Sequence, residues 1–345
     1  MRGVRKKRTT SSGQNKITID EILQKQDAKR LTKKDLMECN TQWLIDGFLV
    51  KETLTMFYAA AGSGKSYFVL YLSKFLLEKG KIQRVYYFDG DNSKASFKGR
   101  NGDKFIQNPN LCYYSELGNK KFTLFDALSK ANDLSNTLIV IDSIRNFITG
   151  DFNKDVKVMK TLNKLQTLRD NGATVIFLHH QPKQKEDENN KTYKGATSFL
   201  DSVDEGYFLY SKPNKQNKNE FIIITEPQKH RFQTEPKAFK LNILNLSLEN
   251  VDYLQYAETQ KAQVSINLVK EILNEHKKLC QQDLVNKIKR KIEEDYVEIV
   301  GKNTLWNLLD KYDGVKWKIT YQSSQTRGGK KKFFENIETK EQNNA

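Results

Sequence analysis

The sequence predicts an α/β fold with a mostly parallel sheet, followed by a small C-terminal domain of a different pattern. The first observation is a series of short apolar runs, most of them β-branched or aromatic, as in strands buried on both faces. The second is helical periodicity between these runs. The runs read LTMFYA, RVYYFDG, TLIVIDS, ATVIFLHH, GYFLY and EFIIIT.

Two helices are predicted between strands, over residues 66–80 and 156–172, and a glycine closes each of them. Residues 184–195 carry no apolar anchor and are typical of a long mobile loop. Residues 211–220 are polar and are expected to connect two antiparallel strands.

The pattern changes near residue 258, where short helices replace the alternation of strands and helices. We therefore expect four regions. They are a basic, partly disordered arm over residues 1–40, the α/β domain over residues 41–257, the C-terminal domain over residues 258–336 and a disordered tail over residues 337–345.

Composition and charge favour a polyanionic partner. The chain has 345 residues, of which 37% are hydrophobic and 29% charged, and its formal net charge is +16. A strongly basic protein attracts nucleic acid, although a lysine-rich, solvated surface is the alternative explanation of this charge. The basic start, MRGVRKKRTTSSGQNK, is not a secretory signal because no hydrophobic stretch follows it. It is either an arm that contacts nucleic acid or a solvated tail.

The cysteines and the apolar runs exclude several classes of protein. Cys39, Cys112 and Cys280 are scattered without CxxC spacing, so neither a disulfide framework nor a zinc site is expected. No apolar run approaches the roughly 20 residues that span a bilayer. A reducing cytoplasm is the expected compartment.

The segment AAAGSGKS, Ala59–Ser66, follows a predicted strand and precedes a predicted helix. It matches the phosphate-binding pattern GxxxxGK[ST] except at its first position, where Ala59 replaces glycine. Alanine costs stability there only if its φ is positive. Lys65 is expected to neutralise the β- and γ-phosphates, and Ser66 to ligate Mg²⁺. The predicted nucleotide contacts are Ala60, Ala61, Gly62, Ser63, Gly64, Lys65, Ser66 and Tyr67.

Acidic residues end two later strands. Asp142 ends TLIVID, which predicts a carboxylate that holds Mg²⁺ together with Ser66. Asp91 and Asp89 end the strand after the P-loop helix, at the edge where open α/β sheets bind ligands. Asp91 is the predicted group that orients the attacking water, with Asp89 in reserve. The alternative is that Asp91 or Asn92 caps the next helix.

Basic and imidazole side chains complete the predicted site. His179 and His180 end a strand, and alternation directs only one of them inward, for which we take His180; Gln181 is a further candidate for sensing the γ-phosphate. A purely structural histidine pair is the alternative. Lys229 and Arg231 lie two residues apart and suit a pair that acts on the nucleotide of a neighbouring subunit, although exposed basic pairs are usually solvated.

Together these residues resemble the RecA/DnaB superfamily of AAA-type ring ATPases, especially the RepA-like hexameric replicative helicases of plasmids. The resemblance covers about residues 40–245 and implies a RecA-like P-loop NTPase core. It rests on WLIDG (43–47), AAAGSGKS, FDGDN, IVIDSIRNF, FLHHQPK, KGATSFLDSVD (194–204) and KHR.

The resemblance implies a role for each matched residue. Asp91 takes the place of the catalytic base, which is more often glutamate in that family, and Lys229 and Arg231 take the place of the pair that acts across the subunit interface. It also implies a ring with single-stranded DNA in its channel, contacted by Arg145, Lys183 and Lys194. Only about forty residues precede this core, whereas DnaB carries a large helical domain there.

The C-terminal region predicts a winged helix that lies outside the minimal RepA-like fold. Helices are expected over residues 265–278, 281–292 and 301–312, followed by a hairpin that turns at Gly328 and Gly329. A winged helix binds DNA or, alternatively, another protein. The predicted contacts are Lys302, Asn303, Asn307 and Lys311 on the third helix and Arg327, Lys330, Lys331 and Lys332 on the wing.

The sequence thus predicts an enzyme that hydrolyses ATP with Mg²⁺. We expect a homo-hexameric DNA helicase that replicates a plasmid, phage or mobile element in the bacterial cytoplasm. Two alternatives stay open. One is an ATP-gated DNA-binding initiator or regulator that does not unwind DNA, and the other is a RecA-like recombination mediator that forms filaments.

Overall fold

A computed structural model of the chain divides into two compact units, Met1–Gln42 and Trp43–Ala345. In the first unit, α1 (Ile19–Lys25) and α2 (Lys33–Glu38) are short helices with exposed side chains. Thr18 and Glu21 form a reciprocal capping pair at the start of α1. The residues that the structure describes are 18–25, 30–38, 40–150, 154–181, 193, 197–214, 217–323 and 330–337.

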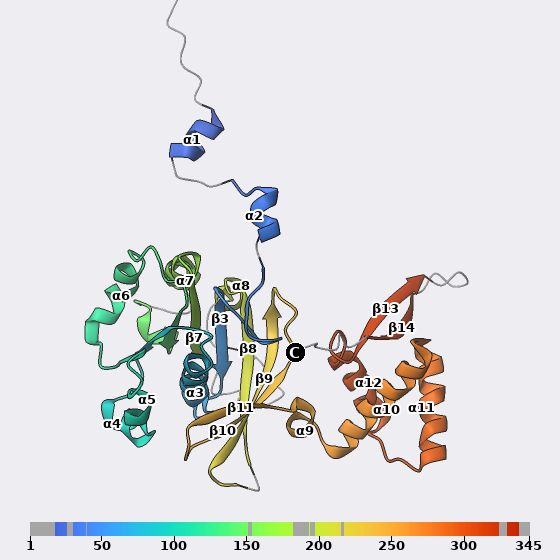
Figure 1. Ribbon diagram of the computed structural model, residues 1–345. Coiled ribbons are helices and arrows are strands. Elements are labelled where there is room, and N and C mark those ends of the chain that lie inside the picture. The colour runs from blue at the N-terminus through green and yellow to red at the C-terminus, as the bar shows by residue number, and fades with distance from the viewer. Residues whose placement is uncertain are drawn as a thin grey trace, which may run out of the picture. The chain divides into compact units, whose positions relative to one another are not determined.

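The second unit is built on one large sheet, which has nine strands in the described part of the chain (Figure 1). Its order is β11-β10-β9-β8-β3-β7-β6-β4-β5. The strands from β8 to β5 are parallel, and β9, β10 and β11 extend the sheet with antiparallel pairs. The strands are β3 (Leu54–Ala59), β4 (Arg84–Asp89), β5 (Leu111–Tyr114), β6 (Thr137–Asp142), β7 (Ala173–His180), β8 (Glu205–Pro213), β9 (Glu220–His230), β10 (Lys237–Asn242) and β11 (Ser247–Val251).

The prediction of an α/β fold with a mostly parallel sheet is confirmed, and this sheet fits a RecA-like core. All six apolar runs are strands, and β8 and β9 are antiparallel as expected. Their connection is shorter than the predicted 211–220, because β8 extends to Pro213 and β9 begins at Glu220. A hairpin of β1 (Trp43–Ile45) and β2 (Leu49–Val50) precedes β3. The loop predicted over residues 184–195 lies outside the described residues except for Tyr193.

Helices cover both faces at the centre of the sheet, which explains why strands such as β3 and β6 are buried at every position. Phe57 of β3 packs in one core with α3 (Lys65–Glu78), whereas Met56 packs in the other with α7 (Asp155–Asp170). The two helices predicted over residues 66–80 and 156–172 are therefore confirmed. The shorter helices are α4 (Lys94–Gly99), α5 (Gly102–Phe105), α6 (Lys121–Leu128), α8 (Ser198–Asp201) and the 3₁₀ turns Gly118–Lys120 and Ile144–Phe147.

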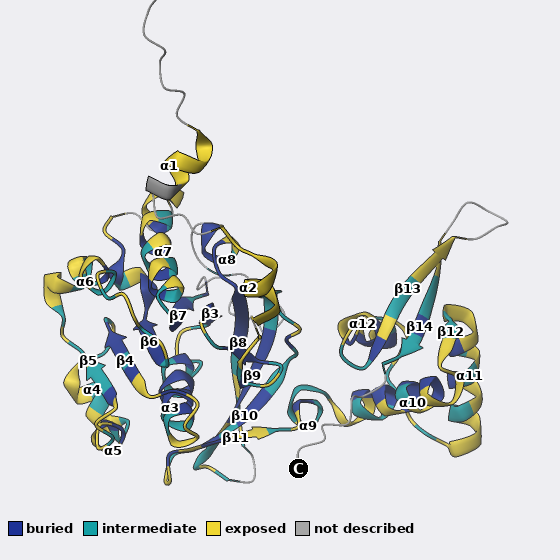
Figure 2. Cartoon of the chain, turned by 45° about the horizontal axis from the view of Figure 1, so that its top comes forward, coloured by how far each residue is buried: buried dark blue, intermediate teal, exposed yellow. Residues whose placement is uncertain are grey.

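The C-terminal part of this unit has its own small sheet and a separate core. Trp317 is fully buried there and donates a hydrogen bond of 2.8 Å to the carbonyl of Leu309. The same core includes Ile222 and Ile224 of β9, and α9 contacts β9 and β10 at this point (Figure 2). The elements are α9 (Tyr253–Ala257), α10 (Gln260–His276), β12 (Lys278–Cys280), α11 (Gln281–Asp295), α12 (Lys302–Lys311), β13 (Trp317–Ser323) and β14 (Lys330–Asn336).

Three helices and a hairpin occur in the C-terminal region in the predicted order. The helix predicted from residue 265 begins earlier, at Gln260, because Thr259 caps it by accepting a hydrogen bond from the N–H of Ala262. The sequence did not predict β12, which completes an antiparallel sheet of order β12-β14-β13. Gly328 and Gly329 lie outside the described residues. Among the helices of the described residues, none has the length and apolar character of a membrane-spanning segment.

Candidate nucleotide site

The loop between β3 and α3 has the backbone that a phosphate cradle needs. Gly62 and Gly64 have φ values of +76° and +86°, in the left-handed region that favours glycine. A Cβ on Gly64 would lie 3.3 Å from the side chain of Ile223, so a larger residue would also require a small shift of that side chain. Ala59, in contrast, ends β3 in an extended strand conformation, paired with His180. Alanine in place of the first glycine of the motif therefore causes no backbone strain.

The side chains of this loop converge on the carbonyl of Ala60. The ammonium of Lys65 donates to this oxygen at 3.0 Å, and the hydroxyl of Ser63 donates to it at 2.8 Å. Burial lowers the pKa of Lys65, and the negative charges of Asp142 and Asp91 partly offset this effect. A buried ammonium with carboxylates near it is suited to bind an anion that arrives with a metal ion.

The first turn of α3 completes the cradle. Its N–H groups have no partners within the helix and, with the helix dipole, favour a bound phosphate. Of the remaining predicted contacts, Ala60, Ala61 and Ser63 lie in the loop, and Ser66 and Tyr67 lie in this turn. The guanidinium of Arg100 lies over the Tyr67 ring, 5.0 Å from its centre.

The two predicted metal ligands are close together. Asp142 is 2% exposed at the end of β6, and Ser66 donates a side-chain hydrogen bond to its carboxylate. The hydroxyl of Tyr87 donates a second one, at 2.8 Å. Burial and the neighbouring charge of Asp89 raise the pKa of Asp142 to about 6.

A hydroxyl and a carboxylate are the hard oxygen donors that Mg²⁺ prefers. In the described part of the chain there is no cluster of three or more His, Cys, Asp or Glu side chains that could hold a metal ion. The donor set fits Mg²⁺ nevertheless, because Mg²⁺ commonly takes one or two protein ligands and completes its shell with water and substrate phosphates.

The two aspartates after β4 have different environments. Asp89 is 1% exposed and accepts hydrogen bonds of 2.8 Å from the N–H groups of Asp91 and Asn92. The Asn92 side chain and the Tyr113 hydroxyl also donate to it. This carboxylate therefore holds the turn after β4. The alternative that Asp91 or Asn92 caps the next helix is wrong, because Ser93 is the N-cap of α4.

The Asp91 carboxylate is held at both oxygens yet its side chain is 36% exposed. The side-chain amide of Asn146 donates to Oδ1, and the Nε2 atom of His180 lies 3.5 Å from Oδ2. Burial alone would raise the pKa of Asp91, but the hydrogen bonds from His180 and Asn146 outweigh it and keep the pKa below its usual value. Asp91 is thus an ionised, accessible carboxylate.

The two histidines at the end of β7 differ in the same way. His179 is 1% exposed, and its ring lies 4.3 Å from the ring of Phe199 in the core. His180 is partly exposed and faces Asp91. Since β7 lies between β3 and β6, His180 emerges between the P-loop and Asp142. Gln181 follows, with 4% exposure and its N–H bonded to the Ala59 carbonyl.

Lys229 and Arg231 lie at the end of β9, and both side chains have partners within the chain. Pairing between β8 and β9 shifts at Gln228, just before this segment, and such bulges change the direction of side chains. The ammonium of Lys229 donates to the carbonyls of Leu200 and Asp201. Arg231 pairs at 2.9 Å with Asp204, although its side chain is 56% exposed.

The predicted nucleic-acid contacts are distributed over several surfaces. Arg145 is exposed in the 3₁₀ turn after β6, and Lys302, Asn303 and Asn307 are exposed on α12. Lys183, Lys194 and Arg327 lie outside the described residues.

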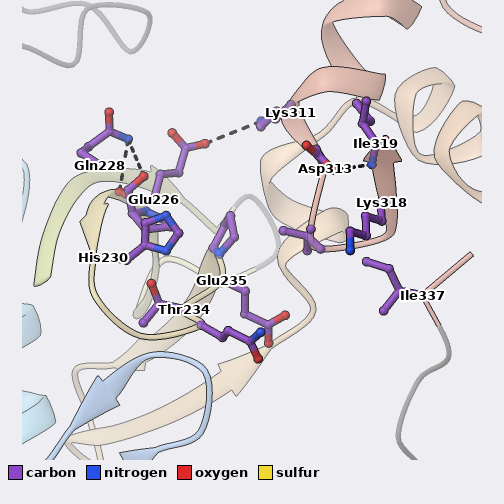
Figure 3. Close-up of a pocket in the computed structure, with 15 residues that line it drawn as sticks. Glu226, Gln228, His230, Thr234, Glu235, Lys311, Asp313, Lys318, Ile319 and Ile337 are labelled. Carbon is purple, nitrogen blue, oxygen red and sulfur yellow. Dashed lines mark hydrogen bonds and ion pairs between the residues drawn. The ribbon is translucent and has the colours of Figure 1, made fainter. Parts of the chain in front are cut away.

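Lys311 is oriented differently from the other predicted contacts of α12. Its ammonium lies 2.6 Å from Glu258 and 3.6 Å from Glu226, beside a pocket of about 810 Å³ (Figure 3). The rings of Tyr253 and Tyr312 flank it at 5.7 and 5.6 Å. The structure therefore places this lysine against the large sheet, on β9.

Several residues of the site were missed by the sequence reasoning. Tyr87 and Asn146, which hold Asp142 and Asp91, belong to segments that the motifs include, but nothing local distinguishes them from neighbouring residues. Asp204 anchors Arg231, pairs with Arg169 at 3.0 Å and accepts from the N–H of Leu54 at 2.9 Å.

Comparison with known protein families supports the reading of this site. A family model described as an AAA domain matches residues 39–186, a segment that contains the P-loop, Asp91, Asp142 and His180. No curated protein matches the chain. The matched segment, the mostly parallel sheet and the geometry of the loop agree with one another. They support a nucleotide-binding domain of the P-loop NTPase kind, similar over residues 39–186 to the AAA domain.

Proposed function

We propose that this protein is an ATP-hydrolysing DNA helicase or translocase of the RepA-like type, which acts as a homo-hexamer in the replication of a plasmid, phage or mobile element. The observation that carries the hydrolytic part is the arrangement at the carboxyl edge of the sheet. The phosphate-binding lysine, Lys65, and the hydroxyl of Ser66 begin α3. The carboxylate that pairs with this hydroxyl, Asp142, ends β6, and the ionised, accessible Asp91 follows the adjacent strand β4.

Each group has a role that follows from its surroundings. Mg²⁺, held by Ser66 and Asp142, would draw charge from the phosphates during cleavage. Lys65 and the first turn of α3 bind and orient the β- and γ-phosphates. Asp91 accepts a proton from the attacking water or orients it. His180, whose Nε2 atom lies 3.5 Å from Asp91, is the proposed sensor of the γ-phosphate.

The proposed ring gives Lys229 and Arg231 a function that their own subunit does not supply. Their side chains contact the segment of α8 and Asp204. To stabilise the charge on a neighbour's nucleotide, they would exchange these contacts for phosphate oxygens. The side chain of Arg231 is 56% exposed, so it can leave Asp204 without crossing the protein core.

DNA is the proposed polymer because the chain carries a net charge of +16. Arg145, Lys183 and Lys194 are the proposed contacts of a single strand in the ring channel. We further propose that the C-terminal part is a winged helix. The succession of α10, β12, α11, α12 and the hairpin β13–β14, with its strands in one antiparallel sheet, supports this assignment.

A second candidate is an ATP-gated initiator or regulator that binds DNA without unwinding it. The observation that favours it is the contact of α12 with β9 through Lys311, since nucleotide-dependent changes in the sheet would reach a DNA-binding helix directly. A filament-forming recombination mediator is a third, and negative-stain images of filaments rather than rings would favour it.

Strand displacement tests the proposal. A forked duplex is incubated with the intact protein, with Lys65→Ala, and with Lys79→Ala as a control that removes an exposed lysine from the far end of the same helix. The helicase proposal expects ATP-dependent displacement by the intact protein and by the control, and none by Lys65→Ala. Hydrolysis without displacement on forks with either tail would overturn the helicase and support the regulator.

A further inference from the structure

A basic groove runs between α11, α12 and β14 in the C-terminal part of the chain. Its volume is about 560 Å³. Among the described residues that line it, none is acidic, and the polar ones are lysines and side-chain amides beside Cys280. The residues that matter here are Lys289, Lys302, Lys330, Lys331, Lys332 and Trp306.

The lysines of this groove lack counter-charges. Within the described part of the chain, four of the five form no ion pair, and the exception is Lys332, which pairs with Asp310. Elsewhere on the same fold, lysines such as Lys261 and Lys278 lie 2.5–2.6 Å from a glutamate. Like charges that converge on one concavity repel one another, so an anion that enters it is attracted by all of them.

Trp306 forms the boundary between this groove and an apolar pocket of about 230 Å³. The two hollows share Val285, Lys289, Lys302 and Trp306, so the apolar pocket opens directly beside two of the lysines. Trp306 is only half-buried, whereas Trp317 of the same core is fully buried and hydrogen-bonded. An aromatic ring is therefore available next to the positive charges.

We propose that this groove binds single-stranded nucleic acid, with phosphates on the lysines and one unstacked base on the ring of Trp306. Proteins that bind single strands combine a positive groove with aromatic side chains in this way. In a duplex both faces of each base are stacked on neighbours, so a ring inside a concave groove has no base face to contact.

The side-chain amides of the groove favour a nucleic acid over an acidic peptide. Gln282 and Asn286 line it together with Trp306, and amides donate to and accept from the edges of a base. The inference rests on the proposed function in that DNA is the partner of this chain. It goes beyond it by assigning the α11 side of the groove, with Lys289, and by making the ligand single-stranded.

Photo-crosslinking of the full chain tests the placement of the strand. An oligonucleotide that carries 5-bromouracil is bound and irradiated, and the adducts are mapped by mass spectrometry. We expect adducts at Trp306 or elsewhere on α11, α12 and β14. Adducts confined to the segment 39–186 would overturn the proposal, while leaving a channel-binding helicase intact.

Binding of a fluorescein-labelled oligothymidylate by four variants tests the energetics. Trp306→Ala is expected to weaken binding about 5- to 100-fold, and Trp306→Phe to retain most of the affinity because it keeps a stacking face. The Lys289→Gln/Lys302→Gln double variant should reduce the slope of log K against log[salt] by about 1.4, because two phosphate contacts are lost. Lys318→Gln is the matched control. Lys318 lies on β13 and lines the pocket beside Lys311 and not the basic groove, so this variant should bind as the intact protein does.

The remaining outcomes are decisive as well. Equal binding by Trp306→Ala and Lys318→Gln would overturn the stacking role, provided both hydrolyse ATP without DNA at the intact rate and are therefore folded. Tighter binding of a duplex, or stronger competition by polyglutamate than by oligothymidylate, would assign the groove to duplex DNA or to an acidic protein instead. The strand-displacement result for Lys65→Ala tests the proposed helicase and does not change how these binding measurements are interpreted.

Discussion

The Nε2 atom of His180 lies 3.5 Å from Oδ2 of Asp91, across the edge of the sheet between β7 and β4. Asn146 holds the other oxygen of the same carboxylate, so a short side chain is fixed from two sides. The short side chain of Asp91 therefore has a defined position and an ionised state.

Asp91→Asn should abolish turnover while preserving nucleotide binding. In the proposed mechanism the Asp91 carboxylate acts on the attacking water and not on the phosphate cradle, so kcat is expected to fall about 100- to 10,000-fold with little change in the affinity for a fluorescent ATP analogue. Asp89→Asn is the matched comparison. Its carboxylate holds the turn after β4, and we expect a loss of stability of about 1–3 kcal/mol in urea unfolding. The reverse result would make Asp89 the catalytic carboxylate.

Ala59→Gly, which restores the first glycine of the P-loop motif, should not improve the enzyme. Ala59 is an extended, fully buried residue of β3, so glycine there adds backbone freedom to the unfolded chain and removes a buried methyl group. We expect a loss of about 1 kcal/mol in chemical unfolding and unchanged ATP affinity. A rise in affinity would show that the loop is strained at this residue.

Gly64→Ala provides the contrast within the same loop. Its φ of +86° and the nearby Ile223 side chain leave no room for a methyl group without strain. About 1–3 kcal/mol of stability should be lost, together with most of the ATP affinity. Isothermal titration of ATP and urea unfolding measure the two effects separately.

Asp142 should make the metal-free protein less stable as pH rises through the weakly acidic range. Its pKa of about 6 in the folded state exceeds the 3.8 of an ordinary aspartate, so the folded chain binds this proton more tightly than the unfolded chain. Stability is lost as pH rises from about 4 to about 6, by up to about 3 kcal/mol. Thermal unfolding without Mg²⁺ at several pH values measures this loss, and Asp142→Asn should remove it. An identical pH slope in both proteins would contradict the raised pKa.

Asp204→Asn should destabilise the large sheet. This nearly buried carboxylate pairs with Arg169 and Arg231 and accepts from the N–H of Leu54 at the start of β3. Removing the negative charge of Asp204 leaves Arg169 without the more buried of its two carboxylate partners. We expect the free energy of unfolding to fall by about 2–4 kcal/mol, measured by urea unfolding. Asp170→Asn, at the exposed partner of the same arginine, should cost less than about 1 kcal/mol. Equal losses would show that Asp204 has no special role.

The sequence predicted the central strands and missed the peripheral ones for a physical reason. Strands such as β3 and β6 are buried on both faces, and their continuous apolar runs are distinctive. In contrast, β5, β10, β11 and β12 lie at or near sheet edges. In β10 and β11 polar residues interrupt the apolar ones, and β5 and β12 have only four and three residues. Such segments resemble loops until neighbouring strands pair with them.

The candidate site was predictable where its chemistry is local. The P-loop is one continuous segment, and its backbone demands glycine at fixed positions, so Lys65 and Ser66 could be assigned directly. The contacts of Tyr87 with Asp142 and of Asn146 with Asp91 each join residues 55 positions apart, and only the folded sheet brings them together. The alternative of a helix cap at Asp91 or Asn92 is wrong because Asp89 already binds the N–H groups of both residues and the helix begins after Ser93.

The strand β9 contacts two parts of the chain to which the proposed function gives different roles. Glu226 accepts a hydrogen bond from Tyr253 at 2.8 Å and pairs with Lys311, and Lys229, three residues further along, contacts α8. If Lys229 and Arg231 change partners when a neighbouring subunit binds ATP, Glu226 moves on the same backbone. Coupling between the two sites is then reciprocal. If ATP changes the affinity of α12 for its ligand by some factor, that ligand changes the affinity for ATP by the same factor. A shift of β9 would thus change both binding equilibria at once.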